Sequence, residues 1–158
     1  KEETLKAINR GHAYADSSNT IIKTYEKGIL TGAHMILGLP GESRGEILLH
    51  AERLSQLPLT TIKLHQLQLI KGTVMAKEYN ANPDKFNLYS MEEYIDLCVD
   101  FAERLNPDIV IERFVSQSPK SLLIAPDWGV KNHVITAKIQ NRFSERNTWQ
   151  GRLFNKIS

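Results

Sequence analysis

Apolar residues recur at intervals of three and four along much of this chain, which is the spacing of one face of an α-helix. Helical segments are predicted over 2–10, from Asp16 or Ser17 to Gly28, and over 44–57, 90–105 and 132–146. Ser43 and Ser90 are each followed three residues later by glutamate, which is the capping-box arrangement that opens a helix. These two serines therefore mark where the third and fourth helices begin.

Three segments between the helices have the composition of strands. They are 29–37, 60–70 and 109–115. The first is apolar and bounded by glycines, so we expect a buried strand. In the second, the two-residue alternation slips at His65 and Gln66. The slip indicates a β-bulge, although a strand buried on both faces explains the pattern equally well.

Helices and strands alternate in order, which predicts the α/β class with a parallel sheet and outer helices. Right-handed crossovers would place the carboxyl ends of all strands at one rim. A closed eight-stranded barrel takes about 250 residues, whereas this chain has 158 residues and three predicted strands. We therefore expect the later part of a partial TIM-type (βα) barrel, with a doubly wound sheet as the alternative. Two segments are assigned to no helix or strand, namely a polar excursion over 71–89 and an apolar patch over 122–125.

Composition places the chain among globular proteins, because 41% of its residues are apolar and 24% are charged. The apolar runs fall far short of the roughly 18 residues that a membrane-spanning helix needs. The charged start at Lys1 and Glu2 also lacks the apolar region of a secretory signal. We therefore expect a cytoplasmic protein without a membrane segment. The chain does not begin with Met, which suggests an excised piece of a longer protein.

Basic residues are concentrated in the last third of the chain. Residues 106–158 carry 8 basic and 4 acidic side chains, whereas residues 1–105 carry 12 and 14. The basic stretch from Arg113 to Lys156, with Trp128 and Trp149 as stacking surfaces, predicts an RNA-binding module of the kind that binds tRNA. A solvated helix face is the more common explanation for a charge excess of this size.

Ligands of α/β proteins bind at the carboxyl ends of the strands, and three such ends carry candidate residues. Gly38 lets the backbone approach a ligand closely, although glycine turns of this kind are usually only turns. His65 and Gln66 need polar partners, either a ligand or each other and the backbone. Glu112 and Arg113 at the third end form either a buried ion pair or a surface pair.

Some isolated residues also carry chemistry. Arg10 lies at a helix C-terminus, where a cation is favourable because of the macrodipole, and its guanidinium can also clamp a carboxylate.

Cys98 falls in the apolar stripe of the helix over 90–105, so we expect it to be packed rather than reactive. Because it is the single cysteine, a disulfide framework or a multi-cysteine metal site built from this chain alone is excluded. His50 and His133 lie in helical segments and are expected at the surface.

Five segments have a recognisable order and spacing. They are 4–12 (TLKAINRGH), 34–42 (HMILGLPGE), 72–76 (GTVMA), 122–126 (LLIAP) and 149–151 (WQG). Together they resemble the radical SAM superfamily, in the half-barrel branch that includes oxygen-independent coproporphyrinogen oxidase and a group of bacterial proteins. The resemblance covers nearly the whole chain. It implies the C-terminal half of a radical SAM (βα)6 core over 1–120 and a C-terminal helical extension over 121–158.

The resemblance also implies an oxidoreductase-type enzyme that cleaves S-adenosylmethionine (SAM) reductively at a [4Fe–4S] cluster and abstracts hydrogen from a substrate. Arg10 occupies the position of an arginine that meets the SAM carboxylate, and His34 stands where that branch has an aspartate near the ribose. Ile36 and Gly38 belong to the strand that lines the adenine. Gln66 falls near the backbone of the next strand, which contacts the adenine. These five residues are the SAM-binding residues that the resemblance implies.

The cysteines that hold the cluster in this family are absent from the chain. The C-x-x-x-C-x-x-C motif belongs to the first half of the barrel, and Cys98 alone cannot hold a cluster. We therefore expect no radical chemistry from the isolated chain, and we expect the N-terminal half of the barrel as its partner. A structural fragment that has no ligand and self-associates through an unpaired sheet edge is a further alternative.

Overall fold

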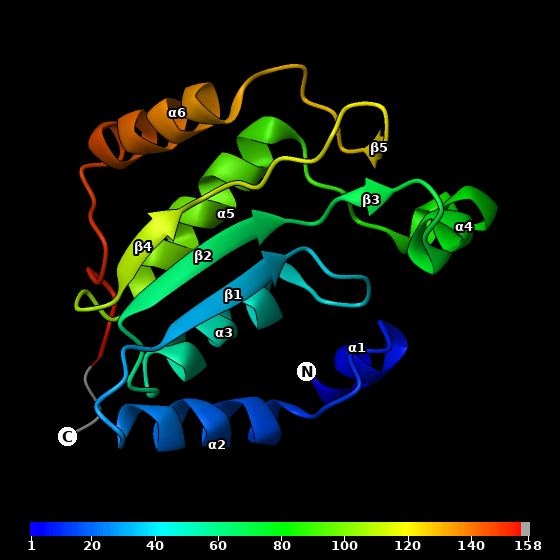
Figure 1. Cartoon of the computed structure of the whole chain (residues 1–158). Coiled ribbons are helices and arrows are strands. Elements are labelled where there is room, and N and C mark those ends of the chain that lie inside the picture. The colour runs from blue at the N-terminus through cyan, green and yellow to red at the C-terminus, as the bar shows by residue number, and fades with distance from the viewer. Residues whose placement is uncertain (156–158) are drawn as a thin grey trace.

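The computed structural model describes residues 1–155, and helices alternate with strands along most of this length (Figure 1). In chain order the elements are α1 (Glu2–Ala7), α2 (Tyr14–Tyr25), β1 (Gly32–Leu37), α3 (Arg44–Leu54), β2 (Thr61–Gln66), β3 (Leu69–Ile70), α4 (Val74–Ala81), the 3-10 helix η1 (Pro83–Lys85), α5 (Met91–Arg104), β4 (Val110–Arg113), β5 (Leu123–Ala125) and α6 (Asn132–Glu145). None of the described helices is both long and apolar enough to cross a membrane.

Three strands form one parallel sheet in the order β1-β2-β4. The connection from β1 to β2 carries α3, and the connection from β2 to β4 carries α5. Both helices cover the same face of the sheet, while α2 lies beyond β1 (Figure 1). Since the strands are parallel, their carboxyl ends meet at one rim. The predicted α/β class with parallel strands and outer helices is confirmed.

The core lies between the sheet and the two helices α3 and α5. Ile62 and Leu64 of β2 are fully enclosed there, as are Tyr94, Cys98 and Phe101 of the stripe that the sequence predicts on α5. Burial raises the pKa of the Cys98 thiol to about 12, so this residue is a packed core residue as expected. The opposite side of α5 packs against α6.

The prediction of a buried strand over 29–37 is wrong in two respects. β1 begins only at Gly32, and its side chains alternate between a half-buried face and an exposed face. Leu30, just before the strand, is 79% exposed, and Ile36 within it is 39% exposed. The reason is that, within residues 1–155, helices cover only one face of the sheet, so the apolar side chains on the other face have no layer packed against them.

The irregularity expected at His65 and Gln66 is the end of a strand rather than a bulge. β2 stops at Gln66, and the chain resumes as β3, which pairs antiparallel with β5. The register shift lies instead between Ile62 and Lys63, where β2 pairs with β4. It places Arg113 opposite Lys63 and leaves one extra residue on β4, which is the geometry of a bulge.

Two elements lie where the sequence predicts none. The excursion over 71–89 contains α4, whose start is capped by the Thr73 hydroxyl, which accepts from the amide of Ala76 at 3.1 Å. The apolar patch over 122–125 contains β5. With 8 and 3 residues, both elements are too short for their periodicity to be recognised. The division of the chain at residue 120 stays a prediction.

Both predicted capping boxes are present. The amides of Ser43 and Ser90 each donate to the carboxylate of the glutamate three residues later, both at 2.8 Å. The start of α2 differs from the prediction, because this helix begins at Tyr14 and not after Asp16. Asp16 instead reaches back and accepts from the amide of Ala13 at 2.9 Å. An acidic residue in the first turn can thus satisfy the amide that precedes the helix.

Candidate functional site

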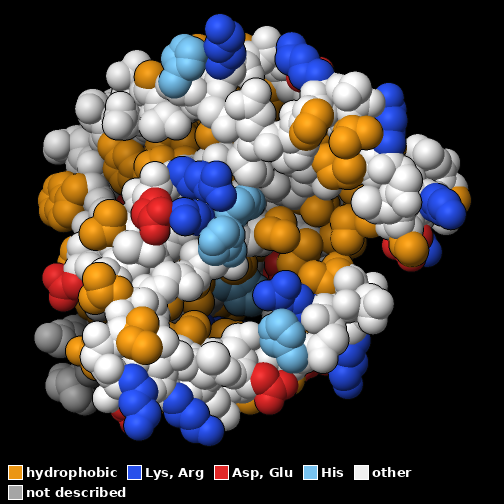
Figure 2. Space-filling view, viewed as in Figure 1, with side chains coloured by type: hydrophobic (Ala, Val, Ile, Leu, Met, Phe, Trp, Pro, Cys, Tyr) orange, Lys and Arg blue, Asp and Glu red, His pale blue; other side chains and the backbone are white. Residues whose placement is uncertain are grey.

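The face of the sheet opposite α3 and α5 carries polar and charged side chains, and we call it the inner face. Its residues are His34 and Ile36 of β1, Lys63 and His65 of β2, and Glu112 and Arg113 of β4. Figure 2 shows this side of the molecule, where histidine, lysine and arginine side chains surround a central hollow. A polar surface on the strands of an α/β protein is a candidate ligand site, because the other face is occupied by the core.

Two histidines on neighbouring strands form the centre of the inner face. The rings of His34 and His65 stack with centroids 5.1 Å apart and an interplanar angle of 22°. Burial lowers the pKa of His65, and the nearby charges of Arg113, His34 and Lys63 lower it further. His65 is therefore neutral at pH 7. Its Nε2 atom is enclosed and has no hydrogen-bond partner within residues 1–155.

The bulge on β4 places two charged residues beside this histidine pair. Lys63 Nζ lies 3.1 Å from Glu112 Oε2. A hydrogen bond from Thr61 and then the one from Lys63 lower the pKa of Glu112, so its carboxylate is ionised. The sequence left open a pair between Glu112 and Arg113, whereas the structure pairs Glu112 with Lys63. Arg113 has no carboxylate partner in the described part of the chain.

A groove of about 660 Å³ lies between β1 and the segment formed by α1 and α2. Arg10 and His12, from the loop after α1, line it together with His34 of β1. The loop turns at Asn9, which takes a left-handed conformation with φ of 54°. The groove therefore brings together Arg10 and His34, two of the five residues that the sequence indicates for SAM. Arg10 makes no ion pair with any described carboxylate.

Gly38 and Gln66 lie together at the rim, in a crevice with a volume of only about 10 Å³. Gly38 has φ of 90°, and a Cβ added to it would lie 3.1 Å from the Tyr89 ring. The Gln66 side chain donates to the Ser116 carbonyl and accepts from the Ser116 amide, each at 2.9 Å. Of the two alternatives that the sequence leaves open for Gln66, the bond to backbone is therefore correct. Its side chain joins the end of β2 to the loop after β4, and one N–H of its amide is left without a partner among these bonds.

His50 and Glu42 form a half-buried pair that the sequence does not predict. His50 Nε2 lies 3.2 Å from Glu42 Oε1, and only 2% of the Glu42 side chain is exposed. The expectation of a surface position for His50 is therefore wrong. Its spacing from Ile47 and Leu54, both buried on α3, places it beside the buried face of the helix. That spacing is the signal by which the sequence could have located it.

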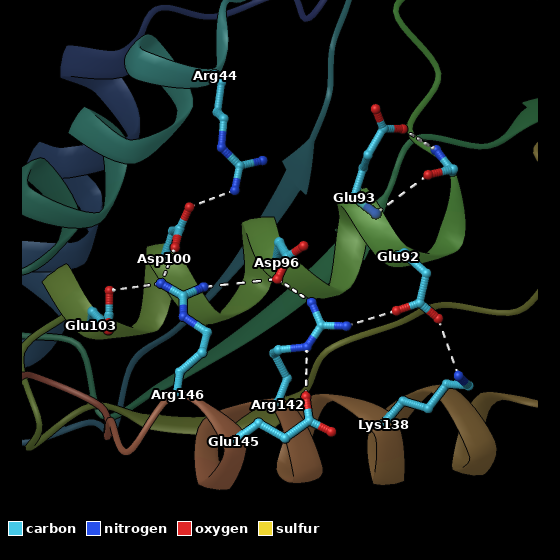
Figure 3. Close-up of polar contacts among 11 residues, drawn as sticks. Arg44, Glu92, Glu93, Asp96, Asp100, Glu103, Lys138, Arg142, Glu145 and Arg146 are labelled. Carbon is cyan, nitrogen blue, oxygen red and sulfur yellow. Dashed lines mark hydrogen bonds and ion pairs between the residues drawn. The ribbon is translucent and has the colours of Figure 1, made fainter.

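Four of the seven described basic residues of the C-terminal third pair with acidic residues of α5, and three of these four are drawn in Figure 3. The pairs are Lys138 with Glu92, Arg142 with Glu92 and Asp96, Arg146 with Asp96, Asp100 and Glu103, and Arg152 with Glu103. Trp128 packs against Tyr94 and donates to the Tyr89 carbonyl, so its ring is not free for stacking on a base. Trp149 is 60% exposed, and Lys156 lies outside the described residues. About half of the charge that motivates an RNA-binding tail is thus used in ion pairs with α5, whereas Arg113, Lys120 and Lys131 make no such pair.

The sequence profile of the Radical_SAM C-terminal domain family matches residues 59–145, which is more than half of the chain. The chain belongs to this family. The uncharacterised protein YtqA of Bacillus subtilis is 31% identical over 99% of the chain, and the uncharacterised protein MJ0486 of Methanocaldococcus jannaschii is 33% identical over 97%. YhcC of Escherichia coli is 32% identical over 80%. The chain spans 48%, 47% and 40% of these relatives' own lengths.

Among solved structures, the Elp3 protein of Methanocaldococcus infernus with an N-terminal deletion has a similar fold. The TM-score is 0.80 at 16% identity, and the similarity covers 95% of this chain and 35% of that chain. This likeness shows the fold alone. Together with the family, it shows that this radical SAM chain is a partial (βα) barrel. The finer placement in the coproporphyrinogen oxidase branch stays a prediction.

Membership of the radical SAM superfamily implies SAM and a [4Fe–4S] cluster in its proteins generally. The residues of this chain do not fit the cluster, because the single thiol, Cys98, is fully buried and its raised pKa keeps it protonated. They do fit a polar ligand such as SAM. The inner face and the groove offer the unpaired Arg10 guanidinium, the exposed Ile36 side chain and the imidazole of His34.

Proposed function

We propose that this chain forms one wall of a radical SAM barrel, and that its inner face and the adjoining groove hold SAM together with part of the substrate. The observation that carries this proposal is the groove of about 660 Å³ that brings Arg10 and His34 together beside the inner face. The chain's membership of the Radical_SAM C-terminal domain family supports it.

Each residue has a distinct task in this proposal. The Arg10 guanidinium can bind the SAM carboxylate through two parallel hydrogen bonds. Ile36 offers an apolar surface to the adenine, and His34 beside it offers a ring nitrogen to the ribose. The backbone of Gly38 forms the end of that wall, where φ of 90° favours glycine. SAM, when bound with the cluster, supplies the hydrogen-abstracting chemistry.

The rest of the barrel and the cysteines for the cluster must come from residues outside this chain. The relatives are about twice as long as the aligned segment, which leaves room for a first half. In residues 1–155, β1 is an edge strand, and the groove lies directly beyond it. A further parallel strand can pair with this edge and would fill the part of the groove that runs along β1, so the proposal leaves SAM the inner face and the part of the groove beside Arg10. Pairing of the same edge with a second copy of the chain is the alternative use of this edge.

The test is the affinity of the full-length protein for SAM. Arg10→Ala should weaken SAM binding by about 1.5–3 kcal/mol, which is a factor of about 10 to 150, because a charged hydrogen bond is lost. Lys6→Ala is the matched control, since it removes a positive charge from the same segment without touching the groove. Unchanged affinity in Arg10→Ala, or an equal loss in both variants, would contradict the role of Arg10.

A further inference from the structure

We propose that Lys63, His65 and Arg113 form a binding site for a phosphate group of the substrate on the inner face. The inference rests on the proposed function only for its setting, namely that substrate enters the barrel on this side. Its support comes from the geometry and charge of the three side chains.

The three residues are brought together by strand register. Lys63 and His65 are two residues apart on β2, so their side chains leave the same face of the strand. The bulge places Arg113 of β4 opposite Lys63. Without the extra residue on β4, the alternation would turn the side chain of Arg113 toward the helices. The bulge thus adds a guanidinium to a face that already carries an ammonium and an imidazole.

The charges on this face are only partly balanced. Glu112 pairs with Lys63 at 3.1 Å, while Arg113 makes no ion pair among the described residues and acts on Glu112 only through its charge, which helps to lower the pKa of that carboxyl. The groups that face His65 are His34 from β1, Lys63 from β2, and Glu112 and Arg113 from β4. One excess positive charge therefore lies beside a histidine whose Nε2 atom is enclosed and unpartnered.

A phosphate group satisfies each of these groups. Its oxygens can accept two hydrogen bonds from the planar guanidinium of Arg113, one from the ammonium of Lys63, and one from the His65 N–H on the ring nitrogen other than the enclosed Nε2. The stack on His34 fixes the ring of His65, so that its nitrogen is already oriented. The site thereby predicts a phosphorylated or phosphodiester-containing substrate.

This site differs in position from the one proposed for the SAM carboxylate. Arg10 lies in the groove beyond the free edge of β1, whereas Arg113 lies on β4 at the opposite edge of the sheet. Two strand spacings separate β1 from β4, which is about 10 Å. We therefore assign the anion at Arg113 to a molecule other than SAM, and displacement of phosphate by SAM tests that assignment.

The test is a titration of the chain with inorganic phosphate at pH 7 and constant ionic strength, followed by the ring resonances of its histidines in NMR spectra. We expect saturable shifts at His65 and His34, an upward shift of the pKa of His65 when phosphate binds, and unchanged signals from His133, which is exposed on α6. Arg113→Gln should weaken phosphate binding by about tenfold or more, because a charged hydrogen bond is lost. Lys131→Gln, which removes a positive charge at the start of α6, should leave it unchanged.

Absent or unsaturable shifts at His65, or an equal loss of affinity in both variants, would overturn the site. A second measurement in the full-length protein separates the two proposals. Displacement of phosphate by SAM would assign the anion to SAM instead of substrate and would overturn the inference while leaving SAM binding intact. Phosphate binding in a protein whose SAM affinity is insensitive to Arg10→Ala would support the phosphate site and contradict the role of Arg10.

Discussion

At the scale of single residues, the site is defined by which polar side chains have partners. Gln66 and His65 are adjacent, yet Gln66 is satisfied by both backbone groups of Ser116, while His65 keeps an enclosed nitrogen without a partner within residues 1–155. The sequence indicates that both residues need partners but cannot say which one is satisfied. The loop that supplies Ser116 is 50 residues away along the chain, and local patterns carry no information about it.

The bond between Gln66 and Ser116 predicts a loss of stability on truncation. Gln66→Ala leaves the amide and the carbonyl of Ser116 without partners, so the free energy of unfolding should fall by about 1–3 kcal/mol. Gln117→Ala removes an exposed glutamine from the same loop and should change the free energy of unfolding by less than about 0.5 kcal/mol. Urea denaturation of both variants measures the difference. Equal effects would show that the bond to Ser116 contributes nothing specific.

At the scale of elements, the helices with strong periodicity are predicted and the short elements are not. The sequence locates α5 because it joins a capping box at Ser90 to a stripe of buried residues, and both features are local. The sequence does not locate α4 or β5, whose few residues carry no periodic signal. From the sequence alone, the basic α6 is predicted to be an RNA-binding surface or a solvated face. Its pairing with α5 is missed, because the acidic partners lie more than 40 residues earlier in the chain.

The pairs between α5 and α6 predict that stability falls in acid. Burial alone would raise the pKa of Asp100, but hydrogen bonds from Arg146 and Arg44 outweigh it and hold that pKa below the ordinary 3.8. Hydrogen bonds from Lys138 and Arg142 likewise lower the pKa of Glu92 from 4.5. Because these values are depressed in the folded state, their stabilisation is complete above about pH 5 and is lost as pH falls through the depressed values.

The check is the free energy of unfolding measured between pH 7 and pH 3. The unmodified chain should lose stability steadily below about pH 5, and Arg146→Gln should lose less over the same range, because the pKa of Asp100 returns toward its ordinary value. Lys131→Gln, outside this set of pairs, should keep the original slope. The same slope in all three proteins would exclude the pairs made by Arg146 as its source.

At the scale of the whole molecule, the pattern of apolar residues reflects surroundings that residues 1–155 do not supply. Leu30, Ile36 and Val110 give their segments the apolar composition of buried strands, yet they are 79%, 39% and 59% exposed. A sequence pattern cannot state which layer covers a strand, so it predicts burial where this chain has an open face. These exposed apolar residues are explained if the inner face is enclosed by the remaining strands of a barrel, as the proposed function requires.

Isoleucine methyl NMR spectra of the full-length protein test whether the inner face beside β1 holds SAM. On addition of SAM, the methyl signals of Ile36 should shift in a saturable way, because an adenine ring would lie against this side chain. The signals of Ile139, buried where α6 packs, should stay in place. Saturable SAM binding that leaves Ile36 unshifted would place SAM elsewhere and would contradict the proposed SAM site on the inner face.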